Sequence, residues 1–244
     1  MWVEPNRCSC GTACGVVQEI MEKTMNVAGT ADDQRRVWNR AQREYASWAN
    51  QRLPIHYIRN IIYLGKKFQR FIGRQGRCLD VGCGNGLISG KSYRDVGYSY
   101  LNKGSVIGLD PLTLQGPKQD WLNEYTRGVC EYLNFRDEVF DSIVFATTLD
   151  HVEDVDATLR ECRRVLKANG TVNIWLTCVY KASKHYVAHP NRFTEPMLED
   201  ALIRNGFEIE NKYVEPFMGI STRGFAVSSG NTVFIKAKKR GEKT

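Results

Sequence analysis

The sequence predicts one α/β domain in which a mostly parallel, seven-stranded sheet lies between helices. Short apolar runs that fit strands alternate with amphipathic segments of helical period from about residue 33 to the C-terminus. The last two strand-like segments follow each other with no helix-length gap, which predicts an antiparallel edge on the sheet. The chain has 244 residues, enough for one core of this kind without a second domain.

Two helices are predicted ahead of the sheet, behind a featureless start. Residues 1–32 show no sustained period, and we expect them to form a flexible N-terminal segment. Within residues 33–75, a first helix runs from Asp33 until Pro54 interrupts it. A second helix follows and places apolar residues such as Phe68 on one side.

The sheet is predicted from seven strand-like segments and the helices between them. The strands begin at Cys78, cover Val106–Asp110, end at Gly128–Glu131, and cover Phe140–Ala146, Thr171–Tyr180, Phe207–Val214 and Thr232–Lys238. The helices cover Leu87–Lys103, Pro117–Glu124, Val155–Leu166 with a left-handed end at Gly170, and a segment that Thr194 caps and Gly206 ends. The carboxyl ends of parallel strands share one edge, where open α/β sheets bind their ligands.

The turn after the first strand carries the first candidate site. It reads Gly82-Cys83-Gly84-Asn85-Gly86, and glycines at alternate positions let the backbone approach a ligand closely. Amides at the start of the next helix then favour an anionic group. The next strand ends in Asp110-Pro111, where an acid accepts hydrogen bonds from ribose hydroxyls. Leu87 stands where a dinucleotide loop needs its last glycine, which disfavours a nicotinamide-dependent oxidoreductase.

These residues resemble the class I S-adenosylmethionine-dependent methyltransferases, in their small-molecule-type branch. Further matches are Phe140–Phe145, Asp150-His151-Val152, Arg163–Gly170 and Arg192–Glu195, in the expected order. The resemblance implies a Rossmann-like three-layer sandwich over residues 33–244, with 33–75 as helices that cap the cofactor cleft. It also implies S-adenosyl-L-methionine as the cofactor, bound by Tyr45, Asp80, Gly82, Cys83, Gly84, Asn85, Gly86, Asp110, Pro111, Cys130, Glu131 and Thr147.

Some of these cofactor residues have an alternative reading. Tyr45 also fits a core aromatic at helical spacing. Glu131 fits a solvated acid in a turn as well as a neighbour of the adenine. Val129 stands where the family often has an Asp, so the expected carboxylate for the adenine amine is not at that position.

A general base is needed only if the acceptor loses a proton during attack, as a hydroxyl would. The candidates are Asp150 and His151 after the fourth strand, followed by His185 and His189 in the loop Lys181–Arg192. An imidazole with an unperturbed pKa of about 6.5 can take a proton near neutral pH. The alternatives are a packed or cofactor-side histidine for His151, and a solvent-facing loop histidine for His189.

The composition is that of a globular protein with a net charge of +7. Basic residues gather in the second helix and near the C-terminus, at Arg59, Lys66, Lys67, Arg70, Arg74, Arg77, Lys236, Lys238, Lys239, Arg240 and Lys243. They fit a solvated helix face and a frayed tail better than a nucleic-acid surface. No apolar run reaches the roughly 18 residues of a membrane helix, and we expect no membrane span and a cytoplasmic location.

The eight cysteines fit reduced thiols rather than a disulfide framework. Cys8, Cys10 and Cys14 lie close together, but a structural zinc site usually needs four ligands, so we expect no metal. The leading hypothesis is a methyltransferase acting on an oxygen or nitrogen of a small-molecule acceptor. The alternatives are an RNA methyltransferase of the same fold and a non-catalytic cofactor-binding scaffold, while the acceptor and the oligomeric state stay open.

Overall fold

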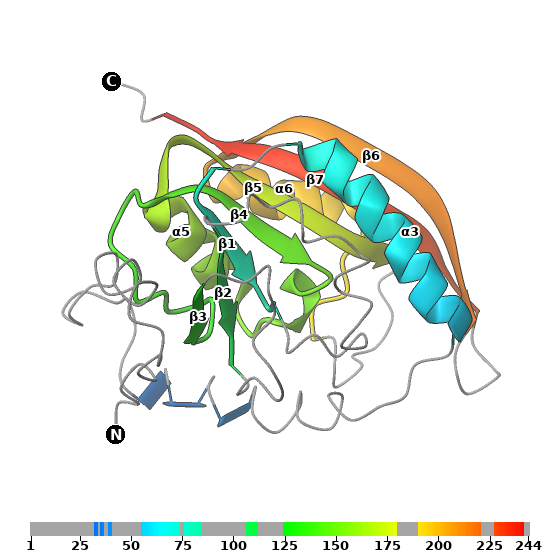
Figure 1. Cartoon of the computed structure of the whole chain (residues 1–244), viewed down its shortest axis with the longest axis horizontal. Coiled ribbons are helices and arrows are strands. Elements are labelled where there is room, and N and C mark those ends of the chain that lie inside the picture. Colours follow the sequence, from blue (N-terminus) through cyan, green and yellow to red (C-terminus); the bar gives the residue numbers. More distant parts are fainter. Residues whose placement is uncertain are drawn as a thin grey trace.

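The computed structural model describes residues 32–33, 35–36, 39–40, 55–73, 76–83, 106–111, 124–179, 190–220 and 227–241. Within them, seven strands form one sheet in the order β3-β2-β1-β4-β5-β7-β6 (Figure 1). The strands are β1 Cys78–Val81, β2 Val106–Asp110, β3 Glu124–Arg127, β4 Phe140–Ala146, β5 Leu166–Val179, β6 Phe207–Ile220 and β7 Val227–Lys239. Strands β1 to β5 pair in parallel, whereas β7 pairs antiparallel with both β5 and β6. The predicted α/β sheet with its antiparallel pair is confirmed.

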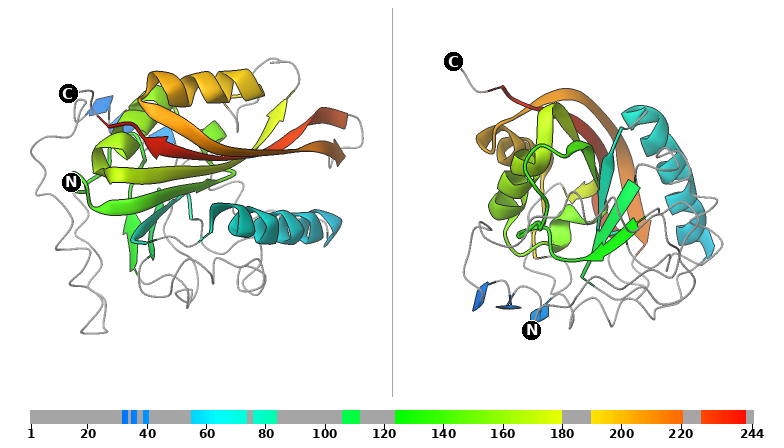
Figure 2. Two further views of the ribbon diagram at one scale, coloured as in Figure 1. Left: turned by 90° about the horizontal axis from the view of Figure 1, so that it is seen from above. Right: turned by 60° about the vertical axis from the view of Figure 1, so that its left-hand side comes forward.

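Helices cover both faces of the sheet. Helix α3 (Ile55–Ile72) lies on one face, and α6 (Glu195–Arg204) lies on the other, beside α5 (Val155–Val165) (Figure 2). Residues 32–33, 35–36 and 39–40 are also helical, as predicted for the segment that begins at Asp33. The three layers follow from the strand pleat, because alternate side chains of a buried strand need cover on opposite faces.

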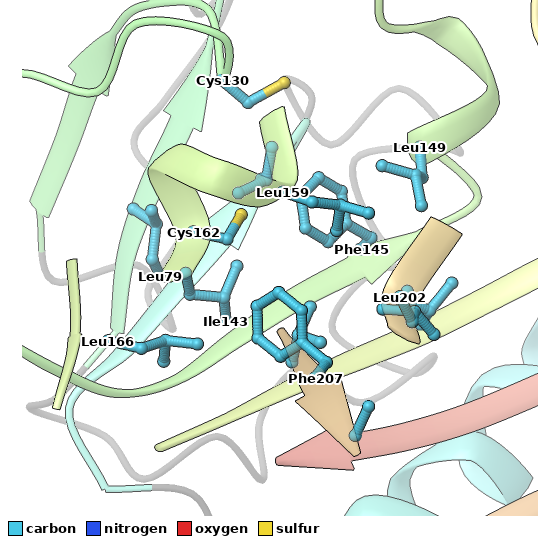
Figure 3. Close-up of a cluster of buried hydrophobic side chains, with 14 of the residues drawn as sticks. Leu79, Cys130, Ile143, Phe145, Leu149, Leu159, Cys162, Leu166, Leu202 and Phe207 are labelled. Carbon is cyan, nitrogen blue, oxygen red and sulfur yellow. The ribbon is translucent and has the colours of Figure 1, made fainter. Parts of the chain in front are cut away.

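The larger core lies between the sheet and the pair α5 and α6. Figure 3 shows Leu79 of β1 and Ile143 and Phe145 of β4 among these buried side chains, with Leu159 of α5. Phe207, at the start of β6, is fully buried in the same cluster. Strand β4 therefore contributes apolar side chains at alternate positions, as expected for a central strand.

The smaller core lies under α3 and has three aromatic rings among its buried side chains. Phe68 packs against Trp175 and Phe234, with ring centroids 5.9 and 5.1 Å apart. At the edge of this contact, the Lys67 amine donates to the hydroxyl of Tyr213 and to the Glu215 carboxylate, the latter at 2.5 Å. The apolar stripe predicted for this helix thus fixes α3 across β5, β7 and β6.

The predicted end of the helix before β5 is wrong. Helix α5 stops at Val165, and Gly170 lies inside β5; the left-handed residue there is Asn169, with φ 66°. Leu166 already has an extended backbone and pairs with Phe140. Its carbonyl accepts a hydrogen bond from the Lys239 amine at 2.8 Å. These contacts of Leu166 therefore end the helix and begin β5 before the chain reaches Gly170.

Two other boundaries differ from the prediction. Glu124 belongs to β3 rather than to a helix, and residues 117–123 lie outside the described part. Strands β6 and β7 are longer than predicted, because they continue to pair with each other beyond the end of β5. Pro216 fits within β6 since an edge strand need not donate every amide. The predicted cap at Thr194 and the left-handed end at Gly206, with φ 81°, are confirmed.

Arg164 of α5 fixes the segment that follows β3. Its guanidinium donates to the carbonyls of Leu133 and Phe135 at 2.7 Å each, and to both Glu161 carboxylate oxygens at 2.9 Å. Glu161 also accepts the Leu133 amide at 2.9 Å. Arg164 therefore satisfies the buried Glu161 carboxylate and two backbone carbonyls that belong to no helix or strand.

We expect Arg164→Ala to lower the free energy of unfolding by about 3 kcal/mol, because it leaves the Glu161 carboxylate buried without its charge partner. Arg164→Lys keeps the charge but loses the planar fork, so its loss should be smaller. Urea unfolding of the two variants and the parent measures both effects. A loss below about 1 kcal/mol for Arg164→Ala would contradict this role.

Candidate active site

Two buried carboxylates lie at the carboxyl ends of neighbouring strands. Asp80 of β1 is 1% exposed, and Asp110 of β2 is 8% exposed. Asp80 pairs in register with Gly108, so Asp110 lies two residues further along the adjacent strand. Residues two apart in a strand point to the same face, and this places both carboxylates on the α3 side of the sheet.

Neither carboxylate oxygen of Asp80 has a hydrogen-bond partner among the residues that the structure describes. Burial raises the pKa of Asp80 well above its usual range, and the nearby negative charge of Asp110 raises it further. A buried carboxylate without donors is costly. The Asp80 carboxylate is therefore suited to a group that brings hydrogen-bond donors or positive charge.

The turn after β1 is fixed by its neighbours. Gly82 has φ 68°, a conformation that favours glycine, and its amide donates to the Leu109 carbonyl at 2.8 Å. The Cys83 amide donates to the same carbonyl at 3.2 Å, and the Cys83 side chain is buried. A Cβ at Gly82 would come within 2.4 Å of the Thr148 methyl group. The turn therefore begins in one defined conformation between β2 and β4.

The second half of the site lies at the end of β4. Thr147 has φ 60°, uncommon for a β-branched residue, and its amide donates to the Trp175 carbonyl at 2.8 Å. A short 3-10 helix, η2 (Leu149–His151), follows. The Asp150 Oδ1 and His151 Nε2 atoms are 3.9 Å apart, and each side chain is about a fifth exposed. The structure thus puts the two described base candidates side by side.

Asn191 holds this second half in place and was not predicted from the sequence. Its amide donates to the Asp150 carbonyl at 3.2 Å, and its side-chain nitrogen donates to the Val152 carbonyl at 2.5 Å. Phe193 adds a further backbone link, since its carbonyl accepts the Val179 amide at 2.8 Å. The segment before α6 is therefore joined to the turn that carries Asp150 and His151.

Glu131 is a buried residue rather than a solvated acid. Only 3% of it is exposed, and its carboxylate accepts the Glu153 amide at 2.7 Å. Burial raises the pKa of the Glu131 carboxyl above its usual value. The Cys130 thiol lies 3.6 Å from the Thr158 hydroxyl and is also buried. Both side chains are therefore buried, with partners inside the protein.

A groove of about 720 Å³ opens next to Glu131, on the side of the sheet that carries α5 and α6. It is lined by Arg36, Glu131, Tyr132, Glu153, Asp154, Val155, Asp156, Pro190, Asn191, Arg192, Phe193, Met197, Asp200 and Arg204. Glu153 forms ion pairs there with Arg36 and Arg40. The groove does not include Asp80 or Asp110 and is separate from the carboxylate pair.

The structure brings together Asp80, Gly82, Cys83, Asp110, Pro111, Thr147, Asp150 and His151 at the ends of β1, β2 and β4. Tyr45, Gly84, Asn85, Gly86 and His189 lie outside the described residues, as do Cys8, Cys10 and Cys14. In the described part of the chain, no cluster of His, Cys, Asp and Glu fits a metal ion. No helix of that part is long and apolar enough to cross a membrane.

Comparisons with known proteins agree with this arrangement. Residues 79–174 match a family model described as a methyltransferase domain. An uncharacterized methyltransferase of Schizosaccharomyces pombe is 28% identical over 182 residues, which cover 66% of this chain and 58% of that protein. The human mitochondrial ubiquinone biosynthesis O-methyltransferase is 31% identical over 153 residues, which cover 57% of this chain and 38% of that protein. The chain thus spans less than two thirds of either relative.

A solved structure shows the same fold. The putative methyltransferase of Haloferax volcanii, in complex with the Trm112 methyltransferase activator, superposes with a TM-score of 0.61 at 16% identity. The match covers 84% of this chain and 99% of that one. At this identity the likeness establishes the fold alone.

We expect Asp80→Asn to raise the melting temperature near pH 7.5 by about 3 °C. An unfolded Asp ionises near pH 3.9, whereas the folded pKa of Asp80 is raised, so the folded chain binds more protons between these two values. The parent therefore loses stability as pH rises through that window, and the variant, which cannot ionise, does not. The gain should be smaller at pH 4.5.

Asp141→Asn is the matched control, because the pKa of Asp141 is shifted in the opposite direction to that of Asp80. Asp141 accepts the Arg77 amide and the Lys167 amine, both at 2.8 Å, and these contacts hold its pKa below the usual range. The stability it provides is present above pH 3.9 and is lost as pH falls through its folded pKa. Asp141→Asn should therefore melt below the parent at pH 7.5. Equal shifts for both variants would contradict the assignment of Asp80.

Proposed function

We propose that this chain, a class I S-adenosylmethionine-dependent methyltransferase, transfers the methyl group to an oxygen or nitrogen of a small organic acceptor. One observation carries the proposal. The buried carboxylates of Asp80 and Asp110 and the turn at Gly82 stand directly beside the strand end that presents Asp150 and His151. A cofactor half and a proton-accepting half therefore share one edge of the sheet.

The described residues fit S-adenosylmethionine. The cofactor carries an ammonium group, a sulfonium and ribose hydroxyls, so it brings both positive charge and donors to Asp80 and Asp110. The two Asp80 oxygens, which have no partner in the described part of the chain, are suited to such donors. When bound, the cofactor supplies an electrophilic methyl group, and the protein has to orient the acceptor and exclude water.

The residues after β4 support an acceptor that loses a proton. The His151 imidazole stands within 3.9 Å of the Asp150 carboxylate, and a neutral imidazole beside an acid can accept a proton from a hydroxyl or an amine. The O-methyltransferase relatives named for ubiquinone biosynthesis support an oxygen acceptor on a small molecule. Asn191 holds the same turn from the segment before α6.

The distribution of charge favours a small molecule over RNA. In the basic clusters, Lys67 pairs with Glu215, Lys236 with Glu210 and Lys239 with Glu138. Basic side chains that already have acidic partners are poorly placed to neutralise a row of phosphates.

We expect the purified protein to bind S-adenosylhomocysteine with micromolar affinity and Asp110→Ala to weaken this binding at least tenfold, about 1.4 kcal/mol. The substitution removes the acid placed to accept from the ribose hydroxyls. Calorimetric titration measures both, with NAD as the ligand control. Asp141→Asn, at the opposite end of β4, is the variant control and should keep the parent affinity. A parent that does not bind S-adenosylhomocysteine would contradict the proposed function.

We expect His151→Ala to lower turnover by about 10² or more while leaving the affinity for S-adenosylhomocysteine within about twofold. The loss follows if the imidazole takes the acceptor proton. Methyl transfer is measured with a panel of phenols, catechols and amines, and His151→Gln serves as the uncharged control of similar size. Unchanged turnover in His151→Ala would remove this residue from the reaction.

A further inference from the structure

Thr148 connects the cofactor half of the site to the half that carries Asp150 and His151. Its hydroxyl donates to the Val81 carbonyl at 2.9 Å, so it is bonded to the last residue of β1. Its own carbonyl accepts the His151 amide at 3.0 Å and closes the η2 turn. One residue therefore makes a polar contact to each half.

The Thr148 methyl group adds a steric contact to the same turn. A Cβ built on Gly82 would lie 2.4 Å from this methyl carbon and 2.8 Å from the Thr148 Cβ. Thr148 thus packs directly on the glycine that begins the cofactor turn. The methyl group therefore fills the space beside Gly82, while the hydroxyl bonds to the end of β1 from the β4 side.

The conformation of Thr147 places Thr148 at this position. Thr147 has φ 60°, a left-handed backbone that is strained for a β-branched residue. The hydrogen bond from its amide to the Trp175 carbonyl at 2.8 Å helps to hold this backbone. Strain of this kind gathers at functional sites. Here it turns the chain so that the next side chain meets the end of β1.

We propose that Thr148 is a positioning residue. It fixes the turn that begins at Gly82 and the η2 turn that carries His151 relative to each other. The inference rests on the proposed function, since it assumes that both turns serve one reaction. Thr148 itself is not assigned a contact with substrate or cofactor. A small displacement between the reacting groups lowers the rate strongly, so a residue that fixes both turns affects cofactor binding and turnover together.

The test is Thr148→Val, which keeps the shape of the side chain and removes the hydroxyl. The Val81 carbonyl then loses its donor, and we expect a five- to tenfold weaker affinity for S-adenosylhomocysteine. Turnover at saturating cofactor, with the best acceptor of the phenol, catechol and amine panel, should also fall about tenfold. This pattern differs from Asp110→Ala, which affects cofactor binding, and from His151→Ala, which affects turnover.

Thr148→Ser and Thr171→Val are the matched controls. Thr148→Ser keeps the hydroxyl and should restore both quantities to within about twofold of the parent, a rescue that a purely steric role does not predict. Thr171→Val makes the same change within β5, where Thr171 pairs with Ser142 near the amino end of β4, and should leave both unchanged. If Thr148→Val does not fold, Thr148→Ala adds no bulk and replaces it, with the same expected losses.

The outcomes separate this inference from the proposed function. No S-adenosylhomocysteine binding by the parent contradicts the function itself. A parent that binds, with Thr148→Val unchanged in affinity and turnover, overturns the positioning role alone. A lower melting temperature without a change in affinity or turnover also overturns it, because the contact is then only structural. A change in one quantity without the other shows that Thr148 does not link the two halves.

Discussion

Two carboxylates buried next to each other at the ends of β1 and β2 are the constraint on which the site depends. Asp80 and Asp110 are almost inaccessible, and the pKa of Asp80 is raised by burial and then by the charge of Asp110. Apolar side chains at these positions would cost the empty fold less. A ligand that brings donors or positive charge would lower this cost, and this supports the proposed cofactor site at the two carboxylates.

The rest of the fold keeps this costly edge in place. The larger core, with Phe145 and Leu159, holds β4 against α5, and the aromatic core around Phe68 holds α3 against the opposite face. Arg164 fixes the segment between β3 and β4. Each of these contacts lies away from the carboxylate pair. Stability is therefore provided by the cores and by buried hydrogen bonds, and the site is free to hold an unfavourable charge arrangement.

The sequence predicted what depends on local pattern and missed what depends on partners far along the chain. The glycine turn at Gly82, the acid at Asp110 and the antiparallel pair β6 and β7 follow from residue type and spacing, and the structure has all three in place. Glycine favours a left-handed backbone, which predicts the helix end at Gly170, but pairing of Leu166 in the sheet ends the helix earlier. Asn191 and Thr148 gave no signal, since their partners are backbone carbonyls 39 and 67 residues away in sequence.

The position of Thr147 and Thr148 shows how a parallel sheet can join two functions at one edge. Val81 pairs with Phe145, so β1 and β4 end almost in register. The residues that follow the two strands therefore have to pack beside each other. Gly82 has no side chain, and the Thr148 side chain occupies the space that a Cβ at Gly82 would need. The fit depends on the left-handed backbone at Thr147, which a glycine could adopt with less strain. The Thr147 side chain is exposed, and its β-branch makes the left-handed backbone harder to adopt, so the hydrogen bond from its amide to Trp175 is part of what keeps this fit.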